Sequence, residues 1–330
     1  MIPDLRAAVA ALAAARRIAV VSHVAPEGDA VGTTLACVLA LREWGRVADG
    51  YNADPVPAEL AFLPGRELLC RAARLPEGYD CCLVVDTADR ARAGGLLDDL
   101  AADVPVVNVD HHASNTRFGS VNWVAGEASS AGEMGLALLR GLGAPVGRAA
   151  ATNLYAAIAT DTGSFQYPNA TAAALRAAAE LVELGARPVE VAEGLHAGRD
   201  PREIRLLGAV LAGLGLSPDG RVAWVEISRE LWQGAGVALS ETESFVNYPR
   251  ALRGVQVAVA FKEAEPGTVR VSLRSRSGVD VSRVAMALGG GGHPNAAGCT
   301  VHNTLPEVRA RVLAALADAV RDGGGWGAGA

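Results

Sequence analysis

The sequence predicts an α/β protein with an N-terminal, mostly parallel, doubly wound sheet and a smaller C-terminal α/β domain across a cleft. The chain has 330 residues, which suits two domains, and 50% of them are hydrophobic. Short β-branched runs alternate with helical segments in the first half, as in open sheets with helices on both faces. Between residues 185 and 205 the composition changes to a mixture of Gly, Pro and charge.

Three apolar runs rich in β-branched residues predict buried parallel strands in the first half. They are residues 18–22, 81–86 and 104–109. Helices are expected at residues 30–44, 131–142, 148–161 and 171–184. The Ala-rich run at residues 7–15 is expected to be an amphipathic helix rather than a signal peptide, because Asp4 precedes it and a strand follows at once.

The second half contains further alternating segments. Strands are predicted at residues 221–227, 255–262 and 269–274, and helices near residues 229–235, 281–288 and 305–321. We therefore expect a first domain at 1–187, a linker or hinge at 188–205, a second domain at 206–322 and a flexible tail at 323–330.

Charge and cysteine usage restrict the class of protein. The formal net charge of −6 excludes an overall basic coat for nucleic acid, although it leaves room for a local basic groove. Lys262 is the single lysine, so a phosphate site would have to use Arg or backbone amides. The five cysteines form no CxxC pair, and no apolar run reaches the roughly 20 residues of a membrane span. We therefore expect a cytoplasmic protein with reduced cysteines.

Acidic and imidazole side chains follow each of the three predicted strands of the first half. The residues are His23, Glu27, Asp29, Asp86, Asp110, His111 and His112. Asp161 lies at the end of an Ala-rich helix. Because the carboxyl ends of parallel strands meet at one edge of a sheet, these groups should lie close together.

Such a set of ligands favours a divalent metal. Imidazoles and carboxylates without cysteine suit an ion such as Mn²⁺ better than a structural zinc site. Carboxylates crowded together repel one another, and two metal ions about 3.5–4 Å apart are the usual solution in phosphoryl-transfer hydrolases. Each Asp taken alone has a simpler interpretation as the N-cap of the next helix. The coincidence at three strand ends favours the metal centre.

A glycine-rich segment near the C-terminus is a second candidate site. Gly289 to Gly292 precede His293, and such a run exposes backbone N–H groups that could approach a phosphate. Arg274 and Ser275, at the end of a predicted strand, would add a guanidinium group and a hydroxyl. A helix before the run and the absence of a GKS/T ending exclude a P-loop. The alternative is a flexible turn with solvated arginines.

Taken together, these motifs resemble the DHH phosphoesterase family, and within it the bifunctional oligoribonucleases that also act as phosphatases on 3′-phosphoadenosine 5′-phosphate. The matches are His23-x-x-Pro-Glu-Gly-Asp29, Val84-Val85-Asp86, Asp110-His111-His112 and Asp161-Thr162-Gly163. The GGGGHPNAAG segment is similar to the motif of the C-terminal domain associated with that family. The resemblance extends to about residue 320 and makes residues 1–187 the DHH catalytic domain and 206–322 the substrate-binding domain.

The resemblance implies two Mn²⁺ ions, with Mg²⁺ or Co²⁺ as alternatives. The first would be held by His23, Glu27 and Asp86. The second would be held by Asp29, Asp86, His111 and Asp161, so that Asp86 bridges the two. A hydroxide between the ions would attack phosphorus in line.

The resemblance also gives roles to residues that do not bind metal. Asp86, Asp110 and His112 would form the catalytic set, with Asp110 orienting an imidazole and His112 contacting the substrate phosphate or the leaving oxygen. The remaining substrate phosphate would be held from the second domain. The expected substrate-binding residues are therefore His112 in the first domain and, in the second, Arg274, Ser275, Gly290, Gly291, Gly292 and His293.

One position departs from the family pattern. The family has Asp where this chain has Glu27, which is longer by one methylene and still anionic. Glu27 could bind the first metal after a small loop shift, or it could loosen that site and change the metal preference. We expect Glu27→Asp to retain or raise Mn²⁺-dependent hydrolysis.

The predicted function is therefore hydrolysis of short oligoribonucleotides and bisphosphonucleosides. The net charge and the low aromatic content of 5% disfavour long single strands and long duplex DNA. A cyclic or linear dinucleotide phosphodiesterase is an alternative, as is an inorganic pyrophosphatase, although Lys262 alone does not supply the basic motif of that group. A non-catalytic nucleotide sensor and a homodimer stay open.

Overall fold

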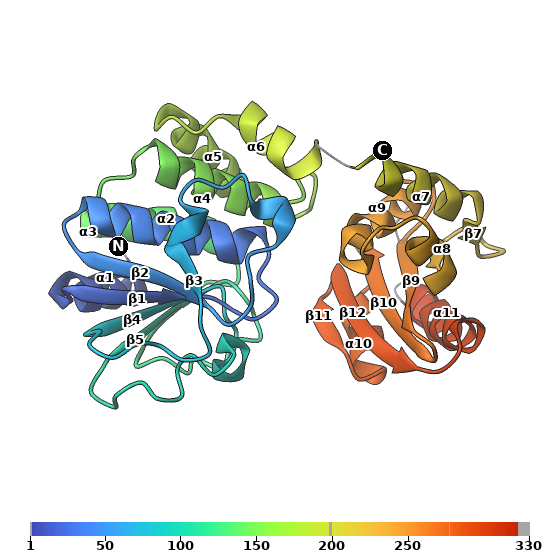
Figure 1. Ribbon diagram of the computed structural model, residues 1–330, viewed down its shortest axis with the longest axis horizontal. Coiled ribbons are helices and arrows are strands. Elements are labelled where there is room, and N and C mark those ends of the chain that lie inside the picture. Colours follow the sequence, from blue (N-terminus) through green and yellow to red (C-terminus); the bar gives the residue numbers. More distant parts are fainter. Residues whose placement is uncertain (1, 198–199, 277, 323–330) are drawn as a thin grey trace. The chain divides into compact units, whose positions relative to one another are not determined.

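The computed structural model describes residues 2–197, 200–276 and 278–322 (Figure 1). The chain divides into two compact units, Met1–Gly198 and Arg199–Ala330, and each is considered by itself. The segment predicted as a linker contains helix α6 (Pro188–His196) and the start of α7 (Pro201–Ala212). The predicted flexible tail, 323–330, lies outside the described residues.

The first unit contains a six-stranded, fully parallel sheet in the order β3-β2-β1-β4-β5-β6. Its strands are β1 (Arg17–Val21), β2 (Val47–Asn52), β3 (Leu69–Arg71), β4 (Cys81–Val85), β5 (Val106–Asp110) and β6 (Val121–Val124). From β1 the chain builds outward to β3, and from β4 it builds outward to β6 on the other side. This is the doubly wound arrangement that the sequence predicts.

The sequence identifies β1, β4 and β5 and misses the other three strands of this sheet. β2 (VADGYN) carries Asp, Gly and Asn, which are depleted in strands, and β3 has only three residues. β6 (VNWV) is short and only partly buried. These outer strands lack the continuous apolar run that marks a strand covered on both faces.

Side chains of the central strands alternate between two packed layers, as a pleated strand requires. In β4, Leu83 and Val85 face a core cluster built with the helices, whereas Cys82 and Val84 face a second cluster. The second layer is irregular chain between residues 88 and 104, in which the 3₁₀ helix η3 (Arg90–Ala93) takes the place of an α-helix. The second face is therefore covered by η3 and turns, where the sequence analysis expects helices on both faces.

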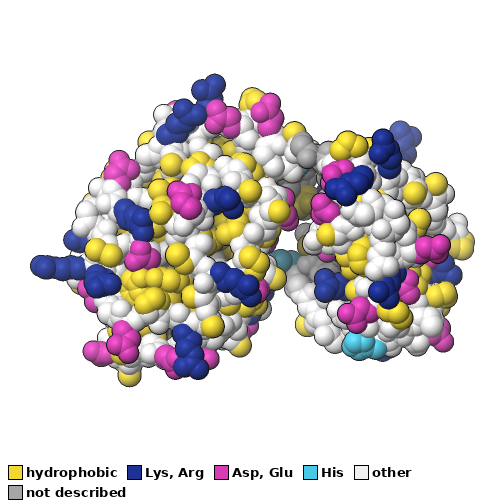
Figure 2. All heavy atoms as spheres, viewed as in Figure 1, with side chains coloured by type: hydrophobic (Ala, Val, Ile, Leu, Met, Phe, Trp, Pro, Cys, Tyr) yellow, Lys and Arg dark blue, Asp and Glu magenta, His cyan; other side chains and the backbone are white. Residues whose placement is uncertain are grey.

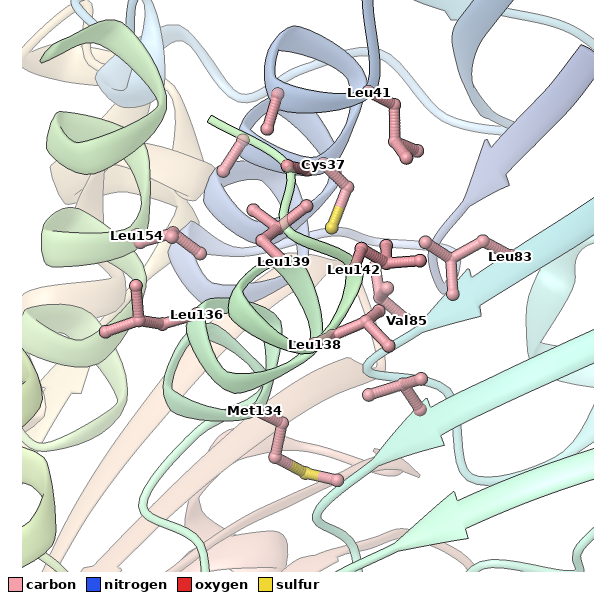
Figure 3. Close-up of a cluster of buried hydrophobic side chains, with 14 of the residues drawn as sticks. Cys37, Leu41, Leu83, Val85, Met134, Leu136, Leu138, Leu139, Leu142 and Leu154 are labelled. Carbon is pink, nitrogen blue, oxygen red and sulfur yellow. The ribbon is translucent and has the colours of Figure 1, made fainter. Parts of the chain in front are cut away.

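The helical layer of the first unit covers the other face of the sheet. Its members are α1 (Pro3–Ala14), α2 (Gly28–Glu43), α3 (Ala131–Leu142), α4 (Arg148–Asp161) and α5 (Ala172–Glu183). Leu138, Leu139 and Leu142 of α3 pack with Cys37 of α2 and Val85 of β4 (Figure 3). Small residues let α2 and α4 approach closely: a Cβ at Gly32 would lie 2.5 Å from a backbone oxygen of α4. This packing fixes the first turn of α2 beside the last turn of α4.

The second unit contains a mixed sheet in the order β11-β12-β10-β9-β8-β7, in which only the β8–β9 pair is parallel. The strands are β7 (Gly215–Leu216), β8 (Val222–Ile227), β9 (Val257–Glu265), β10 (Thr268–Ser275), β11 (Gly291–His293) and β12 (Ala296–His302). The helices are α7, α8 (Arg229–Gly234), α9 (Asn247–Arg250), α10 (Val281–Ala287) and α11 (Leu305–Asp322). The three predicted strands of this half are confirmed.

The glycine-rich segment differs from the expected loop, because Gly291 to His293 form β11 in an antiparallel hairpin with β12. The N–H groups of Gly289 and Gly290 donate to Met286 O and Ala285 O at the end of α10, at 3.0 and 2.8 Å. A Cβ at Gly290 would lie 2.1 Å from Gly298 O. The first glycines therefore end a helix and allow close packing, and they do not offer their N–H groups to a ligand.

Across the described ranges, the longest helices carry too many charges, or are too short, to cross a membrane.

Candidate metal centre

The predicted ligands lie where β1 and β4 stand side by side in the first sheet, the point at which the strand order changes direction. His23 follows β1, Asp86 follows β4 and His111 follows β5. Helix α2 adds Asp29 in its first turn, and α4 ends at Asp161. The structure thus brings together the side chains predicted from the strand ends.

Asp86 lies at the middle of this cluster, with 2% of the residue exposed. Its Oδ2 is 3.4 Å from His23 Nε2, and its Oδ1 is 3.4 Å from His111 Nε2 and 3.6 Å from His112 Nδ1. Asp86 has a φ of 51°, a left-handed conformation that costs energy in a non-glycine residue. Its buried Oδ1 has no hydrogen-bond partner among the described residues. A buried carboxylate oxygen left in this way is expected where a cation belongs.

Asp29 is held rigidly by backbone groups at the start of α3. Its Oδ2 accepts a hydrogen bond from Ala131 N at 2.6 Å, and its Oδ1 accepts one from Gly132 N at 2.8 Å. The Thr33 hydroxyl donates to Oδ1 at 3.1 Å. The positive end of the helix dipole therefore stabilises the carboxylate and fixes its orientation. Asp29 Oδ2 lies 3.7 Å from His111 Nε2.

Asp161 approaches the same imidazole from α4. Its Oδ2 is 3.7 Å from His111 Nε2. The following residues, Gly163, Ser164 and Phe165, all have positive φ. Ser164 N donates to Ala159 O at 2.6 Å, which turns the chain sharply away from the helix end. This turn leaves the Asp161 carboxylate at the edge of the cluster.

Glu27 has two roles available to it. Its carboxylate accepts hydrogen bonds from Ala30 N at 3.1 Å and Asp29 N at 3.2 Å, so it caps the N-terminus of α2. Its Oε1 is also 3.9 Å from His23 Nε2. The cap explains how a Glu is accommodated at this position, and the carboxylate still faces the cluster.

The charges of the cluster shift one another's protonation. Burial raises the pKa of Asp29, and the carboxylates of Asp86 and Asp161 raise it further. Burial is also the main cause that raises the pKa of Asp161 to about 7. Burial lowers the pKa of His23 and of His111, but the Asp86 carboxylate outweighs it and raises each to about 10. Without a metal ion, protons therefore have to balance the crowded carboxylates; a divalent cation would take their place.

Among the residues that the structure describes, three groups of side chains offer ligand atoms within 4.8 Å of one another. They are His23–Glu27–Asp86, Asp29–His111–Asp161 and Asp86–His111–His112. The group with His23 is the complete set expected for one ion. The group with Asp29 contains every ligand expected for the other ion except Asp86. Buried imidazole and carboxylate donors without thiolate suit a divalent cation of the Mn²⁺ type, and the partnerless Asp86 oxygen agrees with that fit.

His112 is oriented through a chain of side chains that the sequence analysis traces only as far as Asp110. His112 Nδ1–H donates to Asp110 Oδ1 at 2.7 Å, and Asp110 is fully buried. Asn115 Nδ2 donates to Asp110 Oδ2 at 2.6 Å and to Asn108 Oδ1 at 2.8 Å. Asn108 in turn donates to Thr87 O at 3.1 Å. Asn108 and Asn115 were missed, since a lone Asn beside a motif carries no distinctive spacing.

A second orienting contact acts on His23. Its Nδ1 is 2.7 Å from Val24 O, and because a carbonyl only accepts, Nδ1 carries the proton. The other nitrogen, Nε2, is therefore the one that faces Glu27 and Asp86. Arg92, from the irregular layer, was not identified from the sequence; its Nη2 lies 3.2 Å from His23 Nδ1, and because both atoms are donors it brings positive charge beside the ring rather than a hydrogen bond.

The residues predicted to hold a second phosphate lie in the second unit, around the hairpin. Ser275 is buried, with its hydroxyl 3.2 Å from Pro294 O and its N–H bonded to Asn295 O, so it fastens the turn of the hairpin. Gly290 and Gly292 pack directly against β12. His293 is exposed, and Arg274 is half-buried opposite Ala296. Arg274 and His293 thus keep side chains near the surface, whereas Ser275 does not.

Comparison with known proteins places these motifs in a family. Residues 17–158 match the DHH family, N-terminal domain, and residues 222–322 match the DHHA1 domain. The chain is 35% identical over 301 residues to a bifunctional oligoribonuclease and PAP phosphatase NrnA of Thermus thermophilus, covering 91% of this chain and 89% of that protein. It is 30% identical to the protein of the same name from Bacillus subtilis, covering 85% and 88%.

A solved structure agrees with the fold. An exopolyphosphatase-related protein from Bacteroides fragilis superimposes with a TM-score of 0.88 over 96% of each chain, at 23% identity. Because both of its domains match and its relatives are 30% identical or more, the chain belongs to the DHH phosphoesterase family and is a hydrolase.

Proposed function

We propose that this hydrolase degrades short oligoribonucleotides to mononucleotides and removes the 3′-phosphate of 3′-phosphoadenosine 5′-phosphate, with two Mn²⁺ ions as cofactors. Relatives that share about a third of its residues over most of their length carry the names of both activities. The observation that carries the proposal is the buried cluster around Asp86. Its Oδ1 lies near the His111 and His112 imidazoles and accepts no hydrogen bond from the described residues.

The ligand sets would divide the cluster in two. His23, Glu27 and Asp86 would hold one ion, and Asp29, Asp86, His111 and Asp161 would hold the other. When bound, such ions lower the pKa of water and neutralise the charge of the phosphate group. Asp29 is pre-organised for this by the amides of α3, and His23 by its bond to Val24.

His112 would serve the substrate rather than a metal ion. Its Nδ1–H is bound by Asp110, so its Nε2 is the atom that can contact a phosphate oxygen or give a proton to the leaving oxygen. Asp110 keeps the ring in one orientation, and Asn115 keeps Asp110 in place. Although His112 also belongs to a possible ligand group with Asp86 and His111, its short bond to Asp110 favours the substrate role.

In the second unit, Arg274 and His293 would bind a further phosphate of the substrate. Both lie on or beside the hairpin, and the guanidinium and imidazole groups suit an oxyanion. Ser275 and Gly290 to Gly292 would act by shaping the hairpin.

The surface favours a short substrate. On the face seen in Figure 2, Lys and Arg side chains of the described residues are interspersed with acidic ones. Together with the net charge of −6, this disfavours a long duplex, which is held mainly through its phosphates. Five free cysteines, four of them buried, agree with the proposed cytoplasmic location.

The test is an assay of two products. Phosphate release from 3′-phosphoadenosine 5′-phosphate and mononucleotide release from a diribonucleotide are measured with Mn²⁺, with Mg²⁺ and with a chelator. We expect both activities with Mn²⁺ and neither with the chelator. Hydrolysis of a cyclic dinucleotide in preference to both substrates would favour the phosphodiesterase alternative. Binding of nucleotide with no turnover under any of these conditions would favour a sensor.

A further inference from the structure

The second unit contains a cavity of about 430 Å³ on the sheet face that also carries Arg274. β10 contributes Arg270 and Ser272 to it, β9 contributes Lys262, and β12 contributes Thr300. Strand register places Arg270 directly opposite both Lys262 and Thr300. Three neighbouring strands thus supply most of its polar side chains, and Glu243 is added from a 3₁₀ helix, Leu239–Val246.

The polar side chains that line this cavity are Glu243, Lys262, Arg270, Ser272 and Thr300, and the first two pair with each other. No hydrogen bond or ion pair joins the Arg270 guanidinium, the Ser272 hydroxyl or the Thr300 hydroxyl to another side chain among the described residues. Three such groups on one face leave the donors of a guanidinium and two hydroxyls for a ligand. Their register on adjacent strands means that one small anion can meet all three.

Lys262 and Glu243 both line the cavity and neutralise each other. Only 1% of Lys262 is exposed, and its Nζ lies 2.5 Å from Glu243 Oε1. Burial lowers the pKa of Lys262, and the nearby guanidinium groups of Arg274 and Arg270 lower it further, against the opposing effect of Glu243. The ammonium group therefore offsets Glu243, and the charge left over is that of Arg270.

Glycines shape one wall of the cavity. Gly289, Gly290 and Gly298 line it with backbone. A Cβ at Gly289 would meet nothing within 4 Å, so this side is open space. A cavity with a glycine wall and a free guanidinium fork admits an oxyanion closely.

We propose that this cavity binds a phosphate group, with Arg270 as its principal ligand and Thr300 and Ser272 as hydrogen-bond donors. Arg274 and His293, the residues proposed to hold a substrate phosphate, are not among those that line this cavity. The group could belong to the RNA substrate or to a free nucleotide or phosphate ion, and the proposal does not depend on chemistry at the metal centre.

The test follows backbone amide resonances of the isotope-labelled full-length protein by NMR. Titration with inorganic phosphate, and separately with AMP, should give saturable shifts at Gly289, Gly290 and Thr300. Arg270→Gln should weaken the affinity by about tenfold or more, the loss expected for one charge-assisted hydrogen bond. Arg253→Gln removes an exposed arginine of the same unit outside the cavity and should leave the affinity unchanged.

A second variant tests whether the affinity for phosphate rises when a negative charge is removed from the cavity. Glu243→Gln removes the carboxylate that pairs with Lys262, so phosphate should bind more tightly. Kinetics with a diribonucleotide then separate the two sources. A higher KM at unchanged kcat in Arg270→Gln would identify the phosphate of the RNA, whereas unchanged kinetics would identify a free anion. The proposal is overturned if phosphate gives no saturable shifts up to about 10 mM, or if Arg270→Gln binds it as tightly as Arg253→Gln.

Discussion

The two sheets present charges of opposite sign. At the carboxyl edge of the first sheet, Asp29, Asp86 and Asp161 are held within reach of the same imidazole. On one face of the second sheet, Lys262, Arg270 and Arg274 lie close enough to influence one another. Carboxylates that lie close together are stabilised by bound cations, and clustered Lys and Arg side chains are stabilised by bound anions. The first unit is therefore suited to a cation and the second to an anion.

The two regions also use their backbones differently. In the first unit, amides at the start of α3 are directed at Asp29 and prepare a metal ligand. In the second unit, the amides of Gly289 and Gly290 bond to carbonyl groups at the end of α10 instead of remaining available for a phosphate. A run of glycines therefore says less about ligand binding than a set of acids at strand ends does.

The largest effect is expected at the centre of the acidic cluster. Asp86→Asn removes the carboxylate that the two proposed ligand sets share, so hydrolysis of a diribonucleotide should fall by more than about 100-fold. The matched control is Asp99→Asn, which removes an exposed carboxylate of the same unit and should leave the rate unchanged. Activity of Asp86→Asn within tenfold of the unchanged protein would remove Asp86 from the proposed mechanism.

The next effect concerns the residue that supports the His112–Asp110 pair. Asn115→Ala removes the donor to Asp110 Oδ2 and should lower kcat by about 10–100-fold, as loss of an orienting partner typically does. Asn122→Ala, which breaks a bond to Gly119 O in a turn of the same unit, should change kcat by less than about twofold. Equal effects of the two variants would show that Asn115 has only a structural role.

Two neighbouring glycines separate packing from binding in the second unit. Gly290→Ala would place a Cβ 2.1 Å from Gly298 O and should lower the free energy of unfolding by about 1–3 kcal/mol, measured with denaturant. Gly291→Ala meets nothing within 4 Å and should change it by less than about 0.5 kcal/mol. A raised KM in Gly291→Ala at normal stability would show that this glycine contacts substrate after all.

The smallest effect is expected at the position that departs from the family pattern. Asp is among the preferred N-cap residues. Glu27→Asp should therefore keep the cap of α2 and keep Mn²⁺-dependent hydrolysis within about tenfold. Glu27→Ala should cost about 1 kcal/mol of stability through the lost cap. A larger loss of activity in Glu27→Asp would show that the longer side chain is matched to this metal site.

Much of the first unit could be predicted from the sequence, because its chemistry follows buried strands. Strands covered on both faces form continuous apolar runs, and the residues directly after them, such as Asp86 and His111, must meet at one edge. The outer strands could not be found this way, since they are short or polar. Asn115 was missed because its role depends on a turn that brings it back to Asp110.

The second unit was less predictable. The sequence predicts β8, β9 and β10, but the pairing of β11 with β12 depends on close contacts that glycine permits at positions 290 and 292. The cavity lined by Lys262, Arg270 and Thr300 assembles residues from three strands whose register the sequence does not give. Sequence patterns indicate where helices and strands lie, whereas the pairs of residues that face each other across strands become known only from the folded structure.

Metal binding itself tests the central claim most directly. Purified protein, stripped with a chelator and dialysed against Mn²⁺, is analysed for bound metal by mass spectrometry, beside Asp86→Asn and Asp99→Asn. The account predicts two Mn²⁺ per chain in the unchanged protein and in Asp99→Asn, and loss of both ions in Asp86→Asn. An unchanged protein that retains no Mn²⁺, or an Asp86→Asn variant that retains two ions, would contradict it.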